Sequence, residues 1–159
     1  MKKAIYPGSF DPITNGHLDI IERAVHLFEI VIISVASNSD KCKALFSEKE
    51  RTNLIWGSVS EIPNIEVDSF EGLMVDHAVK HSAHAAIRGL RALSDFEFEF
   101  KMALMNRSLN EEVSTVFLMP HAKYTHISSS MVREVASLGG DVSKYVPAHV
   151  NKALKDKYE

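Results

Sequence analysis

The sequence predicts an α/β fold, a doubly wound sheet of five parallel strands with flanking helices and a C-terminal helical segment. Two observations predict it. Short β-rich apolar runs alternate with longer helical patterns, and residues 30–36 are almost continuously apolar and β-branched, which is typical of a parallel strand buried on both faces. The length of 159 residues, 45% of them hydrophobic, suits a single globular domain over residues 1–159.

The first three elements are expected to form a β-α-β unit. An apolar strand is expected over residues 4–6. A helix that begins at residues 14–17 follows it, and the strand over 30–36 comes next. One face of this helix carries the apolar residues Leu18, Ile21, Val25 and Phe28. The crossover between the two strands is expected to be right-handed.

Capping and turn residues place most of the other elements. Ser47 with Glu50 three residues later has the form of a capping box, which predicts a helix over about 48–59. The elements expected after it are a strand at 65–70, a helix at 73–81, a strand at 85–87, a strand at 115–119, a helix from Ser128 to Gly139-Gly140, and a helix from Pro147 to about Tyr158.

The segment 95–109 has an ambiguous pattern. Phe96, Phe98, Phe100 and Met102 alternate with charges, as in a strand. We predict a helix instead, because Ser94 and Glu97 have the form of a second capping box and because Phe98, Met102, Met105 and Leu109 continue at helical spacing. Its phenylalanine stripe is more typical of a core or a subunit interface than of a base-stacking surface.

Composition excludes several classes of protein. The formal net charge of −3 argues against broad electrostatic binding to nucleic acid or to an anionic membrane, although a local basic cleft is compatible with it. The single cysteine, Cys42, excludes an internal disulfide framework. Without a secretion signal or an apolar run long enough to cross a bilayer, we expect a cytoplasmic protein with no nucleic-acid or membrane partner.

The loop after the first strand indicates phosphate chemistry. Residues 7–12 bring a hydroxyl at Ser9, and His17 follows at the start of the helix. A helix start has unpaired N–H groups and partial positive charge, so this arrangement suits a phosphate better than a neutral ligand. The sequence therefore predicts a phosphate site, and nucleotide chemistry with it.

Other phosphate-suited groups follow the other strands. Ligands of doubly wound sheets bind at the carboxyl ends of the strands, where the strand order reverses. Lys41 and Lys43 follow the second strand, Met74 the third, Arg88 and Arg91 the fourth, and Lys123, Tyr124 and Ser128 to Ser130 the fifth. These groups are expected to converge at one edge of the sheet.

Three blocks of sequence resemble the bacterial phosphopantetheine adenylyltransferase family. The Thr-x-Gly-His motif at residues 14–17 would by itself mark only the wider nucleotidyltransferase superfamily. The blocks are residues 6–17, residues 87–91 with 95–97, and residues 127–130. Their order and spacing match over essentially the full length. The resemblance implies a Rossmann-like fold, a homohexamer, Mg²⁺ dependence, and transfer of an adenylyl group from ATP to 4′-phosphopantetheine, giving dephospho-coenzyme A and pyrophosphate.

The resemblance also implies roles for individual residues. His17 would contact the α-phosphate of ATP, and Ser9 would lie between the two reacting phosphates; with Lys41 and Arg91 they form the expected catalytic set. Lys41 and Arg88 would receive the phosphate of phosphopantetheine, with Met74 along its arm. The ATP-binding positions would be Ser9, Phe10, His17, Gly89, Leu90, Arg91, Glu99, Tyr124, Thr125, His126, Ile127, Ser128, Ser129 and Ser130.

The chemistry of this reaction requires no covalent intermediate. A phosphate monoester is largely dianionic near neutral pH, so it can attack in line without a strong base. The protein must hold two anions together and stabilise the charge that builds on the α-phosphate and on pyrophosphate. Cations, hydroxyls and amides serve this purpose.

Several alternatives stay open at the level of sequence. Lys43 competes with Lys41, because the loop 40–44 departs from the family pattern by an apparent extra residue and the absence of proline. Glu99 suits a structural role as well as a ligand role. The chain could also be a sibling nucleotidyltransferase with another acceptor, such as nicotinamide mononucleotide or glycerol phosphate, or a nucleotide sensor without turnover.

His77 and His81 have a spacing that can bind zinc, with His84 nearby. Without the glutamate of the protease motif and without carboxylates in the pattern, we interpret them as part of a solvated helix face. The sequence therefore predicts no metal ligands among its residues.

Overall fold

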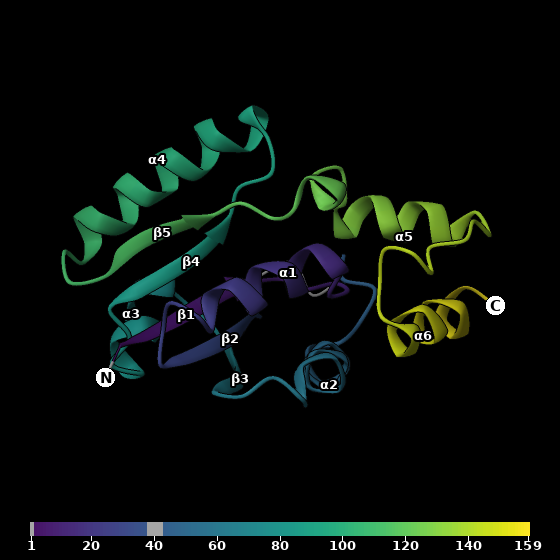
Figure 1. Ribbon diagram of the computed structural model, residues 1–159, viewed down its shortest axis with the longest axis horizontal. Coiled ribbons are helices and arrows are strands. Elements are labelled where there is room, and N and C mark those ends of the chain that lie inside the picture. The colour runs from purple at the N-terminus through teal and green to yellow at the C-terminus, as the bar shows by residue number, and fades with distance from the viewer. Residues whose placement is uncertain (1, 38–42) are drawn as a thin grey trace.

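The chain forms a five-stranded parallel sheet in the order β3-β2-β1-β4-β5 (Figure 1). The computed structural model describes residues 2–37 and 43–159. The strands are β1 (Lys3–Gly8), β2 (Ile30–Ala36), β3 (Ile65–Phe70), β4 (Ala85–Gly89) and β5 (Ser114–Leu118). The order reverses between β1 and β4, which confirms the predicted doubly wound sheet.

The helices occupy the predicted segments. They are α1 (Asn15–Ala24), α2 (Glu48–Val59), α3 (Met74–Lys80), α4 (Leu93–Leu109), α5 (Ser129–Ser137) and α6 (Ala148–Tyr158), with a 3₁₀ turn η1 at Ala122–Tyr124. The capping box of α2 is confirmed: Glu50 N–H donates to Ser47 Oγ at 3.2 Å, and Ser47 N–H donates to the Glu50 carboxylate at 2.7 Å. Helix α1 ends at Ala24, so Val25 and Phe28 of the predicted face lie beyond it.

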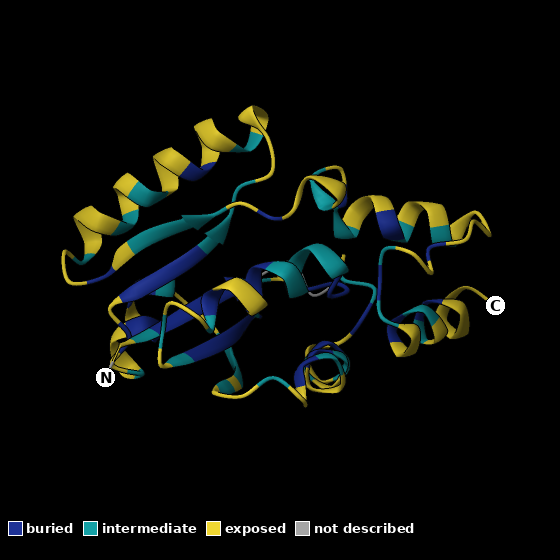
Figure 2. Ribbon diagram, viewed as in Figure 1, coloured by how far each residue is buried: buried dark blue, intermediate teal, exposed yellow. Residues whose placement is uncertain are grey.

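Two hydrophobic cores lie on the two faces of the sheet. The larger core joins the sheet to α1, α2, α5 and α6, with Ile21, Ile55, Val132 and Leu154 as members. The smaller core packs α3 onto the other face around Ile32. The central strands β1 and β2 are buried along most of their length (Figure 2), as the apolar run at 30–36 predicts.

Helix α4 confirms the predicted helix but not its predicted cap. It begins after Ala92, which makes no side-chain cap, so Ser94 lies inside the helix and the Ser94–Glu97 capping box is wrong. The first turn is instead held by Asp95, whose carboxylate accepts the N–H of Arg91 at 3.2 Å and its guanidinium at 3.1 Å. This pair starts the helix one residue before Ser94.

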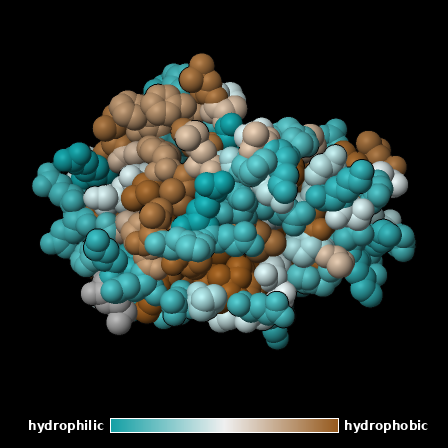
Figure 3. All heavy atoms as spheres, viewed as in Figure 1, coloured by the Kyte–Doolittle hydropathy of each residue, from teal (hydrophilic) through white to brown (hydrophobic). Residues whose placement is uncertain are grey.

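Most of α4 faces solvent in a single chain (Figure 2). Glu99 is its one buried residue, and brown, hydrophobic atoms cover this part of the molecule in Figure 3. The large apolar side chains of α4 that are exposed are Leu93, Phe96, Phe98, Phe100, Met102, Leu104, Met105 and Leu109. The phenylalanine stripe is therefore not part of the core of the chain.

Helix α3 corrects the interpretation of its histidines. His77 is buried, not solvated, and packs against β2 and β3 on the sheet face that α3 covers. Asp68 of β3 lies beside it, so a carboxylate that the spacing along α3 did not reveal is present.

No helix in the described part of the chain is long and apolar enough to cross a membrane.

Candidate active site

A cavity of about 300 Å³ opens at the carboxyl ends of β1 and β4, where the strand order reverses. Both strands end in it, β1 with residues 6–8 and β4 with Arg88 and Gly89. Its lining comprises Tyr6, Pro7, Gly8, Ser9, Phe10, Thr14, Gly16, His17, Ile20, Arg88, Gly89, Arg91, Asp95, Glu99, Pro120, Tyr124, Ile127, Ser128, Ser129 and Ser130. Residues from three separate loops thus meet at this edge.

His17 is fixed by a capping box at the start of α1. Thr14 N–H donates to His17 Nδ1 at 3.0 Å, and the backbone N–H of His17 donates to Thr14 Oγ1 at 3.4 Å. Burial lowers the pKa of His17 to about 4, with the charges of Arg91 and Arg88 adding to the effect. The ring is therefore neutral at pH 7, and because Nδ1 accepts a hydrogen bond, Nε2 carries the hydrogen. His17 thus offers a neutral N–H donor.

Two buried aromatic rings support the imidazole. The Phe10 ring lies 5.0 Å from the ring of His17 and 5.3 Å from the ring of Tyr6, both edge to face. Phe10 has φ of +47°, an unfavourable value for a side chain of its size, which burial of its ring compensates. Burial raises the pKa of Tyr6, so its hydroxyl stays protonated at neutral pH.

Arg88 and Glu99 form a two-bond ion pair across the cavity wall. The Nε and Nη2 atoms of Arg88 donate to the two carboxylate oxygens at 2.8 and 2.6 Å, and Nη1 donates to the carbonyl of Pro7 at 2.9 Å. The hydrogen bond to Glu99 raises the pKa of Arg88 further above its usual value. Both oxygens of Glu99 are engaged in this pair, which links β4 to α4.

Arg91 makes a second pair at the start of α4. It donates to the Asp95 carboxylate at 3.1 Å through Nε and to the carbonyl of Ile127 at 2.8 Å through Nη1. The hydrogen bond from Arg91 is also the main cause that lowers the pKa of Asp95. One guanidinium therefore joins the α4 start to the turn before α5.

The N-terminus of α5 contributes amides and hydroxyls. Ser128 caps the helix by accepting the N–H of Met131 at 3.1 Å, and the Ser129 hydroxyl donates to the carbonyl of Pro12 at 2.7 Å. No hydrogen bond to the hydroxyl of Ser9 or Ser130 is found within residues 2–37 and 43–159. Two helix starts, those of α1 and α5, thus face the same space, an arrangement that favours bound anions.

Sequence reasoning missed the residue that holds the Ser9 loop. Arg51 of α2 is 4% exposed, and its Nη1 donates to the carbonyl of Ser9 at 2.7 Å and to the carbonyl of Ala36 at 3.2 Å. Asp11 similarly accepts the backbone N–H groups of Leu45 and Phe46, both at 2.9 Å. A charge on a surface-like helix gives no sign of such a contact, so no sequence signal could have found Arg51.

Comparison with known proteins identifies the family. A model of the cytidylyltransferase-like family matches residues 5–135. The chain is 55% identical over 158 residues to the phosphopantetheine adenylyltransferase of Heliobacterium modesticaldum, and 54% identical over 157 residues to that of Desulfosudis oleivorans. These alignments cover 99% of this chain and 94% and 93% of the relatives. The chain belongs to the phosphopantetheine adenylyltransferase family.

The solved structure of another adenylyltransferase has the same fold as this chain. It is the bifunctional NMN adenylyltransferase/ADP ribose pyrophosphatase of Francisella tularensis, in complex with AMP and a manganese ion. The TM-score is 0.73 at 16% identity, covering 98% of this chain and 48% of that one. The nucleotidyltransferase-like sheet with flanking helices is thus shared across very different sequences.

Not every residue expected from the family resemblance lies at the cavity. Leu90, Thr125 and His126 are close to it in sequence but do not line it, and His126 packs against the ring of Tyr145 instead. Met74, the first residue of α3, packs against the smaller core and does not line the cavity. Lys41 lies outside the described residues, and the exposed Lys43 does not line the cavity. Lys123, expected at the same edge, does not line the cavity either; its Nζ lies over the ring of Tyr124, 4.9 Å from the ring centre. The other predicted residues all line it.

Proposed function

We propose that this chain transfers the adenylyl group of ATP to 4′-phosphopantetheine in the cytoplasm, giving dephospho-coenzyme A and pyrophosphate. Identity above 50% to phosphopantetheine adenylyltransferases over nearly the whole chain carries the choice of acceptor. The cavity supports the reaction, because it combines two helix starts, a neutral imidazole N–H and two arginines beside hydroxyls. These are the groups that bind and align phosphates.

The reaction is a direct in-line attack of the acceptor phosphate on the α-phosphorus of ATP. The O–P bond to the acceptor forms as the bond to pyrophosphate breaks. His17 Nε2–H donates to an α-phosphate oxygen and stabilises the charge that develops there. Arg91 and the N-terminus of α5 bind the nucleotide phosphates, while Ser9 lies between the reacting groups. Holding the two anions in line supplies much of the rate enhancement.

Arg88 keeps donors for the acceptor phosphate although it is paired with Glu99. A guanidinium has five N–H groups. The bonds to Glu99 and to the carbonyl of Pro7 use three of them. The two that remain, one on Nη1 and one on Nη2, suit two-point binding of a phosphate, with Lys41 as the expected second cation. Glu99 then acts by orienting Arg88 and not by binding ATP.

Mg²⁺ is the proposed cofactor, and the donor set of the cavity fits an ion that arrives on the triphosphate. Mg²⁺ prefers oxygen ligands and is usually held by substrate phosphates, waters and few protein groups. The carboxylates of Asp95 and Glu99 are paired with arginines, which leaves the hydroxyls of Ser9 and Ser130 as the side-chain oxygens best suited to contribute. When bound, the ion neutralises charge on the leaving pyrophosphate.

The quaternary structure proposed by resemblance is a homohexamer. The exposed apolar face of α4 supports an assembly of some kind, because patches of this extent are uncommon on free surfaces. Sedimentation analysis of the purified chain tests the subunit number, and a monomer at micromolar concentration would contradict the proposal. Phe98→Glu, on the exposed face, should weaken the assembly.

Pyrophosphate release from Mg·ATP tests the activity. Release that requires 4′-phosphopantetheine, and that does not occur with nicotinamide mononucleotide, supports the proposal. Equal release with the second acceptor would identify a sibling nucleotidyltransferase. ATP binding without release in either case would identify a sensor.

A further inference from the structure

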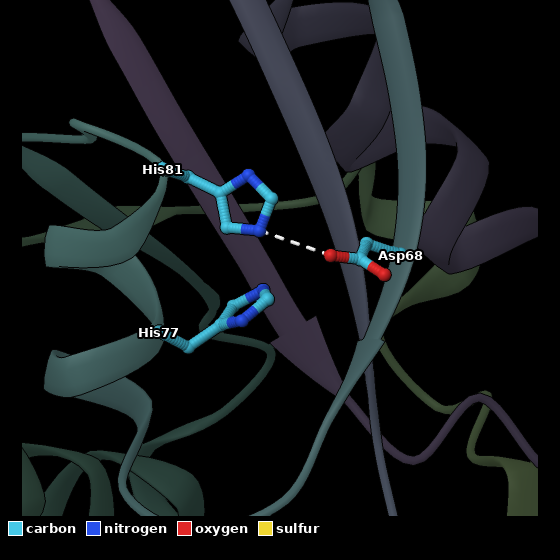
Figure 4. A group of neighbouring side chains, drawn as sticks. All are labelled: Asp68, His77 and His81. Atoms are coloured by element: carbon cyan, nitrogen blue, oxygen red, sulfur yellow. Dashed lines mark hydrogen bonds and ion pairs between the residues drawn. The ribbon is translucent and has the colours of Figure 1, made fainter.

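Three metal-ligating side chains meet on the sheet face that α3 covers (Figure 4). Asp68 comes from the edge strand β3, and His77 and His81 come from α3 and its C-cap. One imidazole nitrogen from each histidine and one carboxylate oxygen lie within 4.8 Å of one another. His81 Nε2 lies 2.9 Å from Asp68 Oδ2. None of the three residues lines the nucleotide cavity.

The packing around His77 fixes its ring. The side chain is 5% exposed, and it stacks on Phe70 with ring centres 4.7 Å apart and planes at 19°. Its Nε2 lies 3.0 Å from the hydroxyl of Ser34, which is itself fully buried in β2. The centres of the His77 and His81 rings are 4.5 Å apart. The stacking and the Ser34 contact together hold the His77 ring beside that of His81.

The surroundings of His77 disfavour a charged ring. Burial is the main cause that lowers the pKa of His77, and the nearby charges of His81 and Lys80 lower it too, while Asp68 opposes them. A metal ion binds a neutral imidazole and an ionised carboxylate, so protons compete with it for these side chains.

The donor set determines which ions fit. Two imidazole nitrogens with one carboxylate oxygen suit Zn²⁺ and similar transition metals, whereas Mg²⁺ and Ca²⁺ prefer all-oxygen sites. Zinc bonds of about 2.0–2.2 Å place tetrahedral ligand atoms about 3.3–3.6 Å apart. The His81–Asp68 contact would open slightly and the His77 nitrogen would close a gap of about an ångström, so the packing holds the ring close to its ligating position and not at it. The side chains of His81 and Asp68 are 21% and 42% exposed, which leaves room for ion entry and for a water ligand.

We propose that Asp68, His77 and His81 bind a divalent transition metal, Zn²⁺ fitting best, separately from the nucleotide cavity. The ion would join α3 to the edge strand β3 through bonds that the short connection 71–73 already brings within reach. Such a site acts on the stability of this β-α unit and does not take part in adenylyl transfer.

Titration of the chelator-treated full chain with Zn²⁺ and with Co²⁺ tests the site. We expect one tight equivalent of Zn²⁺, a rise of several degrees in the melting temperature, and tetrahedral d–d absorption with Co²⁺. Asp68→Asn and His81→Gln keep hydrogen-bonding side chains, and His77→Phe keeps the burial and the stacking. Loss of a group that only orients a metal ligand costs ~10–100-fold in affinity. Each variant loses a ligand itself, so each should weaken Zn²⁺ binding by at least this factor.

His84→Gln is the matched control, because His84 is an exposed histidine just beyond α3 that belongs to no such cluster among residues 2–37 and 43–159. It should bind Zn²⁺ as the wild type does. All variants should release pyrophosphate from Mg·ATP at the wild-type rate, which separates this proposal from the proposed function. Absence of a tight equivalent in the wild type, unchanged affinity in Asp68→Asn and His81→Gln, or a thiolate-to-cobalt band indicating Cys42 would overturn it.

Discussion

The Arg88–Glu99 pair predicts a large stability loss for Glu99→Gln. The carboxylate is 11% exposed and receives two guanidinium hydrogen bonds, at 2.8 and 2.6 Å. Glutamine keeps one acceptor but turns its NH₂ group against the second guanidinium donor, and the charge of Arg88 loses its partner. Removing one member of a buried ion pair costs roughly 3–5 kcal/mol. Because the Arg88 side chain is 34% exposed, water compensates part of this loss.

We therefore expect the free energy of unfolding to fall by about 2 kcal/mol, near half of the fully buried value. This corresponds to a melting temperature about 4–8 °C lower for a chain of this size. Urea denaturation measures the change, with an unchanged m-value as the sign that the folded state is intact. A double-mutant cycle with Arg88→Met isolates the coupling between the two side chains.

Glu97→Gln provides the matched control two residues away. Its carboxylate is 79% exposed and pairs only with Lys101, at 2.9 Å, among the described residues. Exposed pairs of this kind contribute about 0–1 kcal/mol, so the control should be nearly as stable as the wild type. Equal stability of the Glu99 and Glu97 variants would refute the reasoning and favour a ligand role for Glu99.

Three further predictions follow from the site and the caps. His17→Ala should lower kcat about 10²–10³-fold, as loss of one transition-state donor does, with a small change in the Kd of ATP; near-normal single-turnover rates would remove His17 from the mechanism. NMR titration should give His17 a pKa of about 4 in the folded chain. Because the unfolded chain protonates its histidine near pH 6.5, the contribution of His17 should lower the free energy of unfolding as the pH drops from 6.5 towards 4. Ser47→Ala should cost about 1 kcal/mol in urea denaturation, whereas Ser47→Asp should cost little.

The sequence predicted those parts of the fold that local patterns determine. The apolar run at 30–36 and the Ser47–Glu50 capping box located β2 and α2 with their bounds, because burial on both faces and end-capping leave a direct trace in composition. The Ser94–Glu97 pattern was misleading for a tertiary reason. Arg91 donates hydrogen bonds both to the Asp95 carboxylate and to the carbonyl of Ile127. With Asp95 held in this way, the helix starts before Ser94.

The candidate site divides in the same way. Residues of the first loop and of the two helix starts could be located, because the carboxyl ends of parallel strands must share an edge. The partners that hold them could not. Arg51 reaches Ser9 across 42 positions, and Asp68 reaches His81 from a neighbouring strand, so neither contact has a periodicity to read. The roles assigned to the site residues by resemblance stay predictions.

The charge balance of the cavity explains how a chain of net charge −3 can handle two polyanionic substrates. Arg88 and Arg91 are each matched by a carboxylate, so the described lining contributes little net positive charge. We therefore expect affinity for phosphate to come largely from fixed dipoles: the starts of α1 and α5, the neutral His17 N–H and the unused guanidinium donors. Such groups are aimed at particular oxygens and stabilise charge where it develops, whereas unpaired cations would bind substrate, product and transition state alike. A cavity of paired arginines therefore favours turnover over tight retention of pyrophosphate.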